Sequence, residues 1–445
     1  MSAVARYWCE FAWLGGNEVE QGVVVELEGD WIVSVAAGTA AAPTDAVRLE
    51  GMTIPGMANA HSHAFQRALR GRTHGGAGSF WTWRERMYRV AAALDPDAYR
   101  MLARATFAEM ALAGITAVGE FHYLHHGPGG TPYADPNAMA DAVIAAAAEA
   151  GIRITLLDTC YLRGGIGAEL DDVQRRFSDG SAEAWAARAD RLEQRDGVRV
   201  GAAIHSVRAV EPDDARLVAG WAAERSRPLH AHVSEQPAEN EACLEAYGKT
   251  PAVLLGDAGV LSDRFTAVHG THLADRDIEL LSASGAWCCL CPTTERDLGD
   301  GVAPARRLAD AGIPLSLGTD SHAVIDMFEE ARAVELDERL VTGRRGVHRP
   351  VELLRAATEN GHAALGWDEA GRIAPGALAD LVTVATGSVR LAGAEADDAL
   401  ESLVFAAAPS DVRHVIVGGR FVVRDGLHVG LDVPRELREA IEPIR

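Results

Sequence analysis

The chain has 445 residues, of which 48% are hydrophobic and 24% charged, so it can bury a large core in the manner of folded globular proteins. Its net charge of −22 argues against nucleic acid and anionic membranes as partners, because both would repel an acidic surface. The six cysteines are scattered rather than spaced as a disulfide framework, and no apolar run reaches the roughly 18 residues of a membrane span, so we expect a cytoplasmic protein.

Both ends of the chain carry short β patterns. Residues 7–14 and 23–35 are rich in Val, Trp and Phe and are broken by Gly and Asp, and residues 378–385 and 414–426 repeat this character. Each end is too short to fold separately. We therefore expect residues 1–53 and 372–430 to pair in one small β-sandwich domain, followed by a C-terminal tail over 431–445.

Between these ends, eight short apolar runs alternate with helical, Ala-rich stretches. Helical patterns such as 96–114 and 137–151 each close on a glycine. The apolar runs are 52–61, 115–121, 153–160, 198–206, 228–235, 265–271, 285–292 and 313–321. Eight strands separated by helices predict an α/β fold, a parallel (β/α)8 TIM barrel, over residues 54–371.

The run PGMANAHSH ends with His61 and His63, one residue apart. On a strand, residues i and i+2 point to the same face, so both imidazoles could reach one metal ion. An apolar lead-in followed by polar residues is typical of the C-terminal end of a buried strand. In a barrel, that end is where chemistry takes place.

Other polar residues fall near the ends of later predicted strands. His232 lies in the fifth run and Asp320 in the eighth. Together with His61 and His63 they form a nitrogen and oxygen ligand set with room for water, which suits catalytic Zn²⁺; Fe²⁺ or Mn²⁺ is possible on ligand type alone. His230 could replace His232 as a ligand, although a packed histidine is the commoner case.

Two further residues are candidates for catalysis. Glu235 lies three residues after His232, close enough to shuttle protons at the same centre. A neutral His269, on the sixth run, could hydrogen-bond the attacked group. We expect His272 and His322 to lie at the rim or behind the ligands.

Two other groups have simpler interpretations. Cys288 and Cys291 supply only half of a structural metal site, so we expect buried strand cysteines. Three histidines of a predicted polar loop are expected to be solvated, and these are His122, His125 and His126.

The chain has a single lysine, Lys249, located after the fifth run. Two-metal barrels of this kind commonly use a carboxylated lysine on the fourth strand as a bridge. This chain has no lysine on the predicted fourth strand, which predicts one ion per chain.

The motifs PGMANAHSH, HAHVSEQ, TAVHGTH and LGTDSH resemble, in order, those of the mononuclear deaminase branch of the amidohydrolase superfamily. The resemblance covers nearly the whole chain. It implies that His61, His63, His232 and Asp320 are zinc ligands, that Glu235 and His269 act in catalysis, and that Asp320 also takes the water proton. It also implies a homodimer.

Finer stretches are similar to the formimidoylglutamate deiminases of histidine degradation. They are HSHAFQRALRG, SFWTWRERMY, VGEFHYLHH, AAIHSVRAV and CPTTERDLGDG. The resemblance implies hydrolysis of N-formimino-L-glutamate to N-formyl-L-glutamate and ammonia. The implied substrate-binding residues are Gln66, Arg84, Tyr123, His205 and Arg208.

A small dicarboxylate substrate agrees with two of these residues, because arginine grips carboxylates bidentately and Arg84 and Arg208 come from different loops. Two alternatives stay open. The same metal ligands would serve deamination of an aromatic base or nucleoside, such as guanine or an adenosine derivative. The second alternative is a non-catalytic barrel scaffold, although such a protein is expected to have lost its metal-binding residues.

Overall fold

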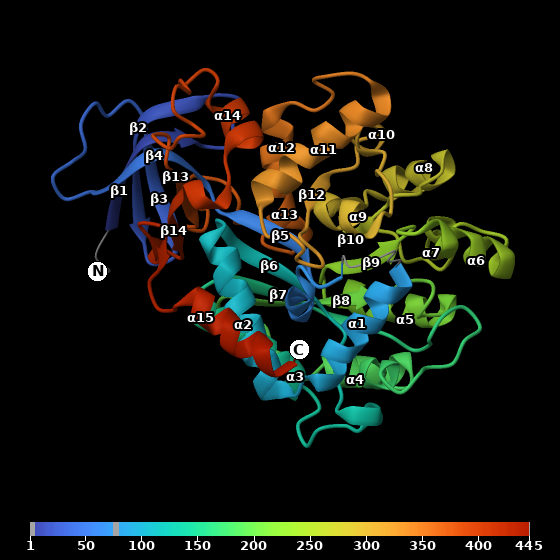
Figure 1. Cartoon of the computed structure of the whole chain (residues 1–445). Coiled ribbons are helices and arrows are strands. Elements are labelled where there is room, and N and C mark those ends of the chain that lie inside the picture. The colour runs from blue at the N-terminus through green and yellow to red at the C-terminus, as the bar shows by residue number, and fades with distance from the viewer. Residues whose placement is uncertain (1–4, 74–79, 445) are drawn as a thin grey trace.

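The computed structural model describes residues 5–73 and 80–444, with the side chains of residues 80–82 left out. Two sheets of eight strands each form its framework, and they lie side by side (Figure 1). One is a parallel sheet wound into a barrel, and the other is a smaller sheet built from both ends of the chain. The predicted fold class is confirmed.

The barrel strands follow one another in chain order, each parallel to the next. They are β5 (Met57–Ser62), β6 (Ile115–His122), β7 (Arg153–Cys160), β8 (Val198–Ile204), β9 (Leu229–Val233), β10 (Phe265–His269), β11 (Trp287–Leu290) and β12 (Leu315–Leu317). Most of their residues are buried, as expected of parallel strands covered on both faces.

The barrel closes where the segment after β12 meets β5. Ser62 and Asp320 form a parallel bridge, and the Asp320 N–H donates to the His61 carbonyl at 3.0 Å. Asn59 spans the same seam: its side-chain amide donates to Thr319 Oγ1 at 2.7 Å and its Oδ1 accepts from the Thr319 N–H at 2.9 Å. The first and last strands of the barrel are thereby fixed beside each other.

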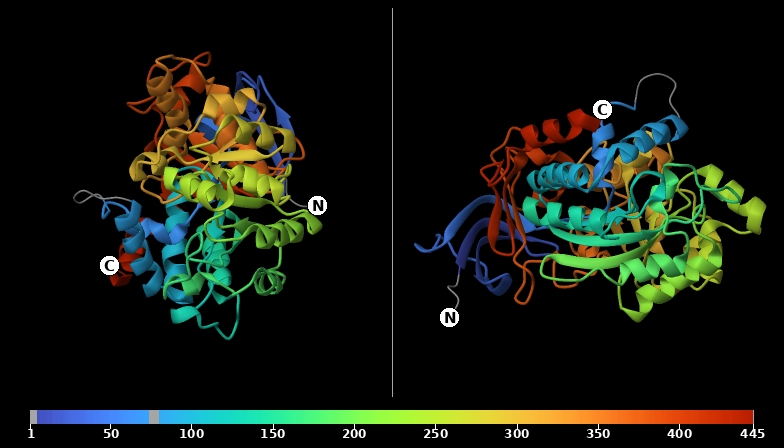
Figure 2. Two further views of the ribbon diagram at one scale, coloured as in Figure 1. Left: turned by 90° about the vertical axis from the view of Figure 1, so that its right-hand side faces the viewer. Right: turned by 90° about the horizontal axis from the view of Figure 1, so that it is seen from below.

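Helices surround the barrel (Figures 1 and 2). Those that precede β9 are α1 (Phe80–Ala93), α2 (Pro96–Leu112), α3 (Ala138–Ala150), α4 (Ala182–Ala189) and α5 (Pro212–Glu224). Those between β9 and α11 are α6 (Pro237–Tyr247), α7 (Pro251–Asp257), α8 (Asp275–Ser284), α9 (Pro292–Leu298) and α10 (Ala305–Asp310). The last are α11 (Met327–Thr342), α12 (Pro350–Ala357), α13 (Glu359–Ala364), α14 (Ala399–Ala406) and α15 (Val433–Ile441).

Local chemistry explains where several helices begin and end. The Asp95 side chain caps α2 by accepting from the Ala98 N–H at 2.8 Å, and Pro96 occupies the first turn. The Ala-rich α3 ends at Gly151, whose φ of 78° is unfavourable for other residues. The C-terminal α15 packs along α2, so the tail lies against the barrel (Figure 1).

The smaller sheet is a single hydrogen-bonded sheet in the order β16-β15-β14-β13-β4-β1-β2-β3. Its strands are β1 (Ala5–Trp13), β2 (Val19–Glu28), β3 (Trp31–Ala36), β4 (Val47–Pro55), β13 (Leu381–Val384), β14 (Val412–Val417), β15 (Arg420–Arg424) and β16 (Leu427–His428). Trp31 at its β3 edge bridges to Leu378, just before β13, so the sheet curls around a second hydrophobic core.

The apolar run 52–61 divides between the two sheets, whereas the sequence suggested one strand. Residues 52–55 end β4 of the smaller sheet, and β5 of the barrel starts at Met57. Gly56 lies between them against Thr116, and a Cβ there would be 2.1 Å from Thr116 Oγ1. This close approach lets the backbone leave one sheet and enter the other without a loop.

None of the helices in the described part of the chain has the length and apolar character needed to cross a membrane.

Candidate active site

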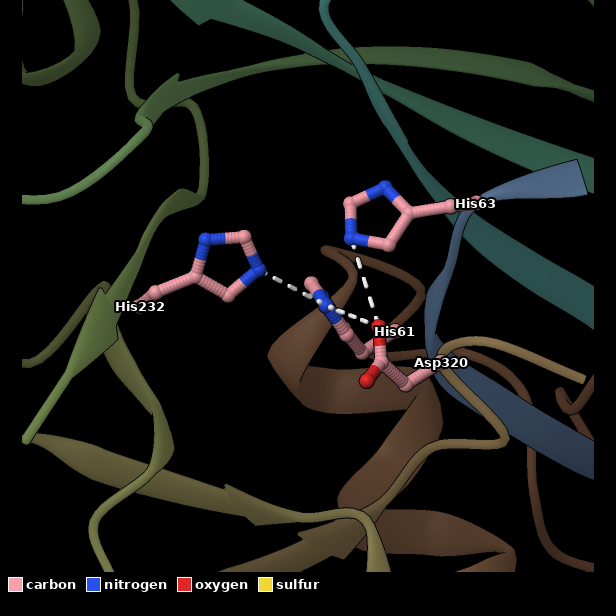
Figure 3. Close-up of side chains that lie close together, drawn as sticks. All are labelled: His61, His63, His232 and Asp320. Carbon is pink, nitrogen blue, oxygen red and sulfur yellow. Dashed lines mark hydrogen bonds and ion pairs between the residues drawn. The ribbon is translucent and has the colours of Figure 1, made fainter. Parts of the chain in front are cut away.

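Four side chains converge at the C-terminal end of the barrel. They are His61 and His63 from the end of β5, His232 from β9 and Asp320 after β12 (Figure 3). One ligand atom from each lies within 4.8 Å of all the others, and all four residues are buried. The structure therefore brings together the four residues that the sequence predicted as metal ligands.

The atoms that could bind a metal lie close together at the centre of this cluster. Asp320 Oδ1 is 3.3 Å from Nε2 of both His61 and His63, and His232 Nε2 is 3.1 Å from His61 Nε2. His63 Nδ1 donates to the Phe121 carbonyl at 3.0 Å, and His232 Nδ1 donates to the His205 carbonyl at 2.8 Å. In the neutral rings, Nε2 of His63 and Nε2 of His232 therefore carry no proton. Their lone pairs thus point inward.

The electrostatics favour the same ligand forms. Burial lowers the pKa of His61 to about 3 and holds the pKa values of His63 and His232 below the usual range, so the rings are neutral. Burial opposes ionisation of Asp320, but the neighbouring His61 outweighs it and keeps the pKa of Asp320 below its usual range. Three neutral imidazoles and one carboxylate fit a divalent cation.

A cavity of about 380 Å³ opens above this cluster. Its lining includes His63, His232 and Asp320 of the cluster and both predicted catalytic residues, Glu235 and His269. All five residues predicted to bind substrate also line it, namely Gln66, Arg84, Tyr123, His205 and Arg208. The site residues named from the sequence, apart from His61, therefore line one cavity, while their individual roles stay predictions.

His269 lies between two carboxylates. Its Nε2 is 4.0 Å from Glu235 Oε1, and its Nδ1 is 3.4 Å from Glu295 Oε1. Burial would lower the pKa of His269, but Glu235 and Glu295 outweigh it and raise that pKa to about 10. In the absence of a bound cation these carboxylates favour the protonated ring, and the neutral form expected from the sequence stays a prediction for the metal-bound protein.

Two functional positions have strained backbones. His269 and Asp320 have φ values of 69° and 41°, in the left-handed region that residues other than glycine rarely adopt. Such strain persists only where the surroundings enforce it, and it is commonest at active sites. Here it turns each side chain toward the cavity at the point where its strand ends.

The predicted substrate contacts have defined neighbours. Gln66 Nε2 donates to the Tyr123 hydroxyl at 3.2 Å, and the Arg84 guanidinium lies 5.5 Å from the centre of the Tyr88 ring. Arg208 Nη2 donates to Glu235 Oε2 at 3.2 Å. The cavity wall thus combines two guanidinium groups with amide and phenol groups.

Other histidines are structural. His230 does not join the ligand cluster, since its Nε2 is 2.9 Å from the Ala364 carbonyl of α13. His322 lies behind the cluster, with Nε2 at 3.1 Å from Ser62 Oγ, and His272 Nε2 is 2.7 Å from the Asp300 carbonyl. The predicted cysteines are indeed buried, as are the other four.

The expectation of a solvated histidine loop was wrong. His122, His125 and His126 are at most 5% exposed. His125 Nε2 lies 2.9 Å from the Thr159 carbonyl, and His126 Nε2 lies 3.0 Å from Asp179 Oδ1. The loop after β6 folds inward over neighbouring barrel strands, which the local polar sequence did not reveal.

Sequence reasoning also missed two buried acids at the site. Glu295 is the last residue of the CPTTE run at the start of α9, and Glu239 is on the first turn of α6, four residues after Glu235. Both are 3% exposed or less. Their positions shortly after a catalytic strand end were the available signal.

The single lysine is in an ion pair away from the cluster, with Lys249 Nζ at 2.6 Å from Asp257 Oδ2. The barrel strand β8, where a bridging lysine would be needed, reads VRVGAAI.

Comparison with known proteins agrees with this arrangement. The model of the amidohydrolase family matches residues 52–422. The chain is 39% identical to a formimidoylglutamate deiminase of Pseudomonas aeruginosa, over 86% of this chain and 87% of that protein. It is 32% identical to an 8-oxoguanine deaminase of the same organism, over 94% and 92% of the two chains. A solved amidohydrolase structure from Brucella melitensis is similar with a TM-score of 0.91 and 35% identity, covering 99% of both chains.

Proposed function

The chain belongs to the amidohydrolase family and is a hydrolytic enzyme acting on a C–N bond, and we propose that its substrate is N-formimino-L-glutamate. Water and this substrate would give N-formyl-L-glutamate and ammonia. One observation carries the proposal: the cavity above the ligand cluster has two guanidinium groups, Arg84 and Arg208, in its wall. A dicarboxylate substrate requires such anchors.

The ligand cluster suits one divalent ion, and we propose zinc. His61, His63, His232 and Asp320 would hold it, since neutral imidazole nitrogens and a carboxylate oxygen are donors that zinc accepts. Such an ion supplies Lewis-acid activation of water at neutral pH. Iron(II) and manganese(II) accept the same ligand types, and elemental analysis of the purified protein distinguishes the three.

The side chains around the cluster divide the proton transfers. Asp320 takes a proton from the attacking water as its oxygen bonds to the formimino carbon. Glu235 carries the remaining hydroxyl proton of the attached water oxygen to the terminal nitrogen, so that the formyl C=O bond forms, the bond from carbon to this nitrogen breaks and ammonia leaves. His269 donates a hydrogen bond to the developing tetrahedral centre. The other nitrogen stays on the glutamate, and the water oxygen becomes the formyl oxygen.

A second candidate is deamination of an aromatic base. The cavity wall also carries aromatic rings, among them Tyr123, Tyr161 and Phe177. These rings could stack on a purine, and one relative is an 8-oxoguanine deaminase. The rings make edge-to-face contacts with one another, with Tyr123 and Phe177 centred 5.0 Å apart, which is also what a packed wall requires.

Ammonia release distinguishes the two functions. The zinc-loaded protein is assayed at steady state with N-formimino-L-glutamate and, in parallel, with guanine and 8-oxoguanine. We expect efficient turnover of the dicarboxylate and none of the purines. Turnover of a purine without turnover of N-formimino-L-glutamate would contradict the proposal and favour the second candidate.

A further inference from the structure

Arg208 contacts two acids at once. Its Nη2 donates to Glu235 Oε2 at 3.2 Å, and its Nε lies 3.7 Å from Glu239 Oε1. The side chain of Arg208 is 25% exposed, whereas those of Glu235 and Glu239 are 9% and 0% exposed. Burial disfavours the charged guanidinium, but Glu239 and then Glu235 outweigh it and raise the pKa of Arg208. The guanidinium is therefore a half-buried cation shared by two carboxylates.

The two acids differ in their other contacts. Glu239 is fixed from behind, because its Oε2 accepts the Glu235 backbone N–H at 3.1 Å on the first turn of α6. The carboxylate of Glu235 faces the cavity, with Oε1 4.0 Å from His269 Nε2. Both acids line the cavity, and Glu235 is the one whose carboxylate also approaches His269.

The contact between Arg208 and Glu235 conflicts with both of their proposed roles. A guanidinium edge that holds Glu235 cannot at the same time take a substrate carboxylate in the bidentate manner. The Glu235 oxygen that Arg208 holds is also not free to turn toward a reacting nitrogen in the cavity. A substrate carboxylate that takes the edge formed by Nε and Nη2 therefore has to displace Glu235 before the reaction.

We propose that Arg208 is a latch on Glu235, which a substrate carboxylate opens by displacing Glu235 from the guanidinium. This inference rests on the proposed function. Glu239 holds Arg208 in place before and after the exchange and is thus a positioning residue. Binding of the correct substrate then frees the group that protonates the leaving nitrogen, so carboxylate recognition and catalysis become coupled.

A simpler role for Glu239 is that of a helix cap, because it accepts a backbone N–H just ahead of α6. The variant Glu239→Gln distinguishes the two roles. Its amide oxygen can still accept the Glu235 N–H, while the charge that faces Arg208 is lost. Glu241→Gln, an exposed position on the same helix, is the matched control.

Binding of the product provides the first test. Calorimetry measures the Kd of N-formyl-L-glutamate for the zinc-loaded protein and its variants. Glu235→Gln should tighten binding about fivefold, because the ligand no longer competes with a carboxylate for Arg208. Glu239→Gln should weaken binding about tenfold, the scale of one charged contact, and Glu241→Gln should leave it unchanged. Unchanged or weaker binding to Glu235→Gln overturns the latch.

Kinetics with two substrates provides the second test. N-butylformamidine has the reacting group but no carboxylate, so it cannot open the latch. Arg208→Gln should raise kcat/KM severalfold for this amidine and lower it about tenfold or more for N-formimino-L-glutamate. Equal losses for both substrates would mean that Arg208 is structural, and the latch would be wrong.

The two proposals fail in different ways. If the wild-type protein releases no ammonia from N-formimino-L-glutamate, the proposed function and the latch fail together. If it does, but the amidine gains nothing from Arg208→Gln, the function stands and the latch alone is overturned. Zinc content and melting temperature of each variant identify any that has merely lost its fold.

Discussion

At the scale of single residues, the role of each histidine depends on its partner rather than on its spacing. His230 and His232 are two apart on β9, and His61 and His63 have the same spacing at the end of β5. His230 is bonded to the Ala364 carbonyl, while His232 is turned by the His205 carbonyl so that Nε2 faces the cluster. The ring nitrogen that contacts a carbonyl determines which nitrogen is left for a metal and where that nitrogen points.

Glu235 and His232 provide a prediction at this scale. Glu235→Gln should keep its metal but lose about 10² to 10⁴-fold in kcat, the usual contribution of a general acid or base. His232→Ala should lose both metal and turnover, because a ligand is removed. Elemental analysis and steady-state ammonia release measure the two effects. If Glu235→Gln loses metal as readily as His232→Ala, the role assigned to Glu235 is wrong.

At the scale of elements, the cluster depends on how closely β5 and the end of β12 approach. Gly318 lies directly over His61: a Cβ at this glycine would be 2.7 Å from His61 Cβ and 2.9 Å from the His61 carbonyl oxygen. Backbone contact at this distance leaves no room for a side chain. One glycine therefore sets the distance between the residues that precede Asp320 and the strand that carries His61 and His63.

Gly318→Ala should therefore weaken the metal site by changing the packing between β12 and β5. The added methyl group pushes β12 away from β5, which costs about 1–3 kcal/mol of unfolding free energy as for other overpacked sites. Metal affinity should fall with it, because His61 and Asp320 separate. Gly220→Ala is the control: nothing lies within 4 Å of that position on α5, and alanine suits a helix better.

Urea unfolding and zinc titration of both variants check this prediction. An alanine at Gly318 that binds zinc with the wild-type affinity would show that the approach of β12 to β5 does not control the site.

At the scale of the whole molecule, buried ion pairs connect separate parts. Arg153 at the start of β7 donates to both oxygens of Asp380, at 2.7 and 3.0 Å, and so links the barrel to the smaller sheet. Near the other end of β7, Arg188 contacts Asp158 and Asp179, each with atoms at 2.8–2.9 Å. Breaking such a pair leaves an uncompensated buried charge.

Asp179→Asn should destabilise the protein by about 3 kcal/mol near pH 7, since it removes one acid from buried Arg188. Burial alone would raise the pKa of Asp179, but His126, His125 and Arg188 outweigh it and hold that pKa well below the usual range. The folded-state pKa is thus below the unfolded value of about 3.9, so the stabilisation is present above that pH and is lost as the pH falls further.

Chemical unfolding of wild type and variant from pH 3 to 8 measures this difference. It should be constant above about pH 5 and shrink below about pH 4. Asp172→Asn is the control, since its side chain is 91% exposed in an ion pair with Arg175. A difference that grows toward low pH would contradict the prediction.

Metal removal also acts on the whole molecule. A ligand bound only by the folded state adds about 4 kcal/mol when present at a thousand times its Kd, so chelation should lower the melting temperature and abolish turnover. Adding zinc back should restore both at one ion per chain, because the described residues bring three histidines and an aspartate together in one cluster at the strand ends, and the single lysine of the chain lies outside the barrel strands. Two tightly bound ions in fully active protein would contradict this.

The sequence by itself determined the eight barrel strands and identified the candidate metal ligands at their ends, with His230 and His232 as alternatives. Both are encoded locally, because apolar runs between helical stretches identify strands and polar residues at strand ends identify the functional face. The pairing of the two chain ends in a small β domain also followed from the pattern, since neither end could bury a core alone.

Only the tertiary structure decided the contacts between segments distant in the sequence. It gave His230 a partner outside the ligand cluster, and it divided the run 52–61 between two sheets at Gly56. It also buried the three histidines at and just after the end of β6. It also placed Glu239 behind Arg208 and Glu295 behind His269. Each outcome depends on which carbonyl, carboxylate or side chain approaches from another strand or helix, and a local pattern of residues carries no information about that partner.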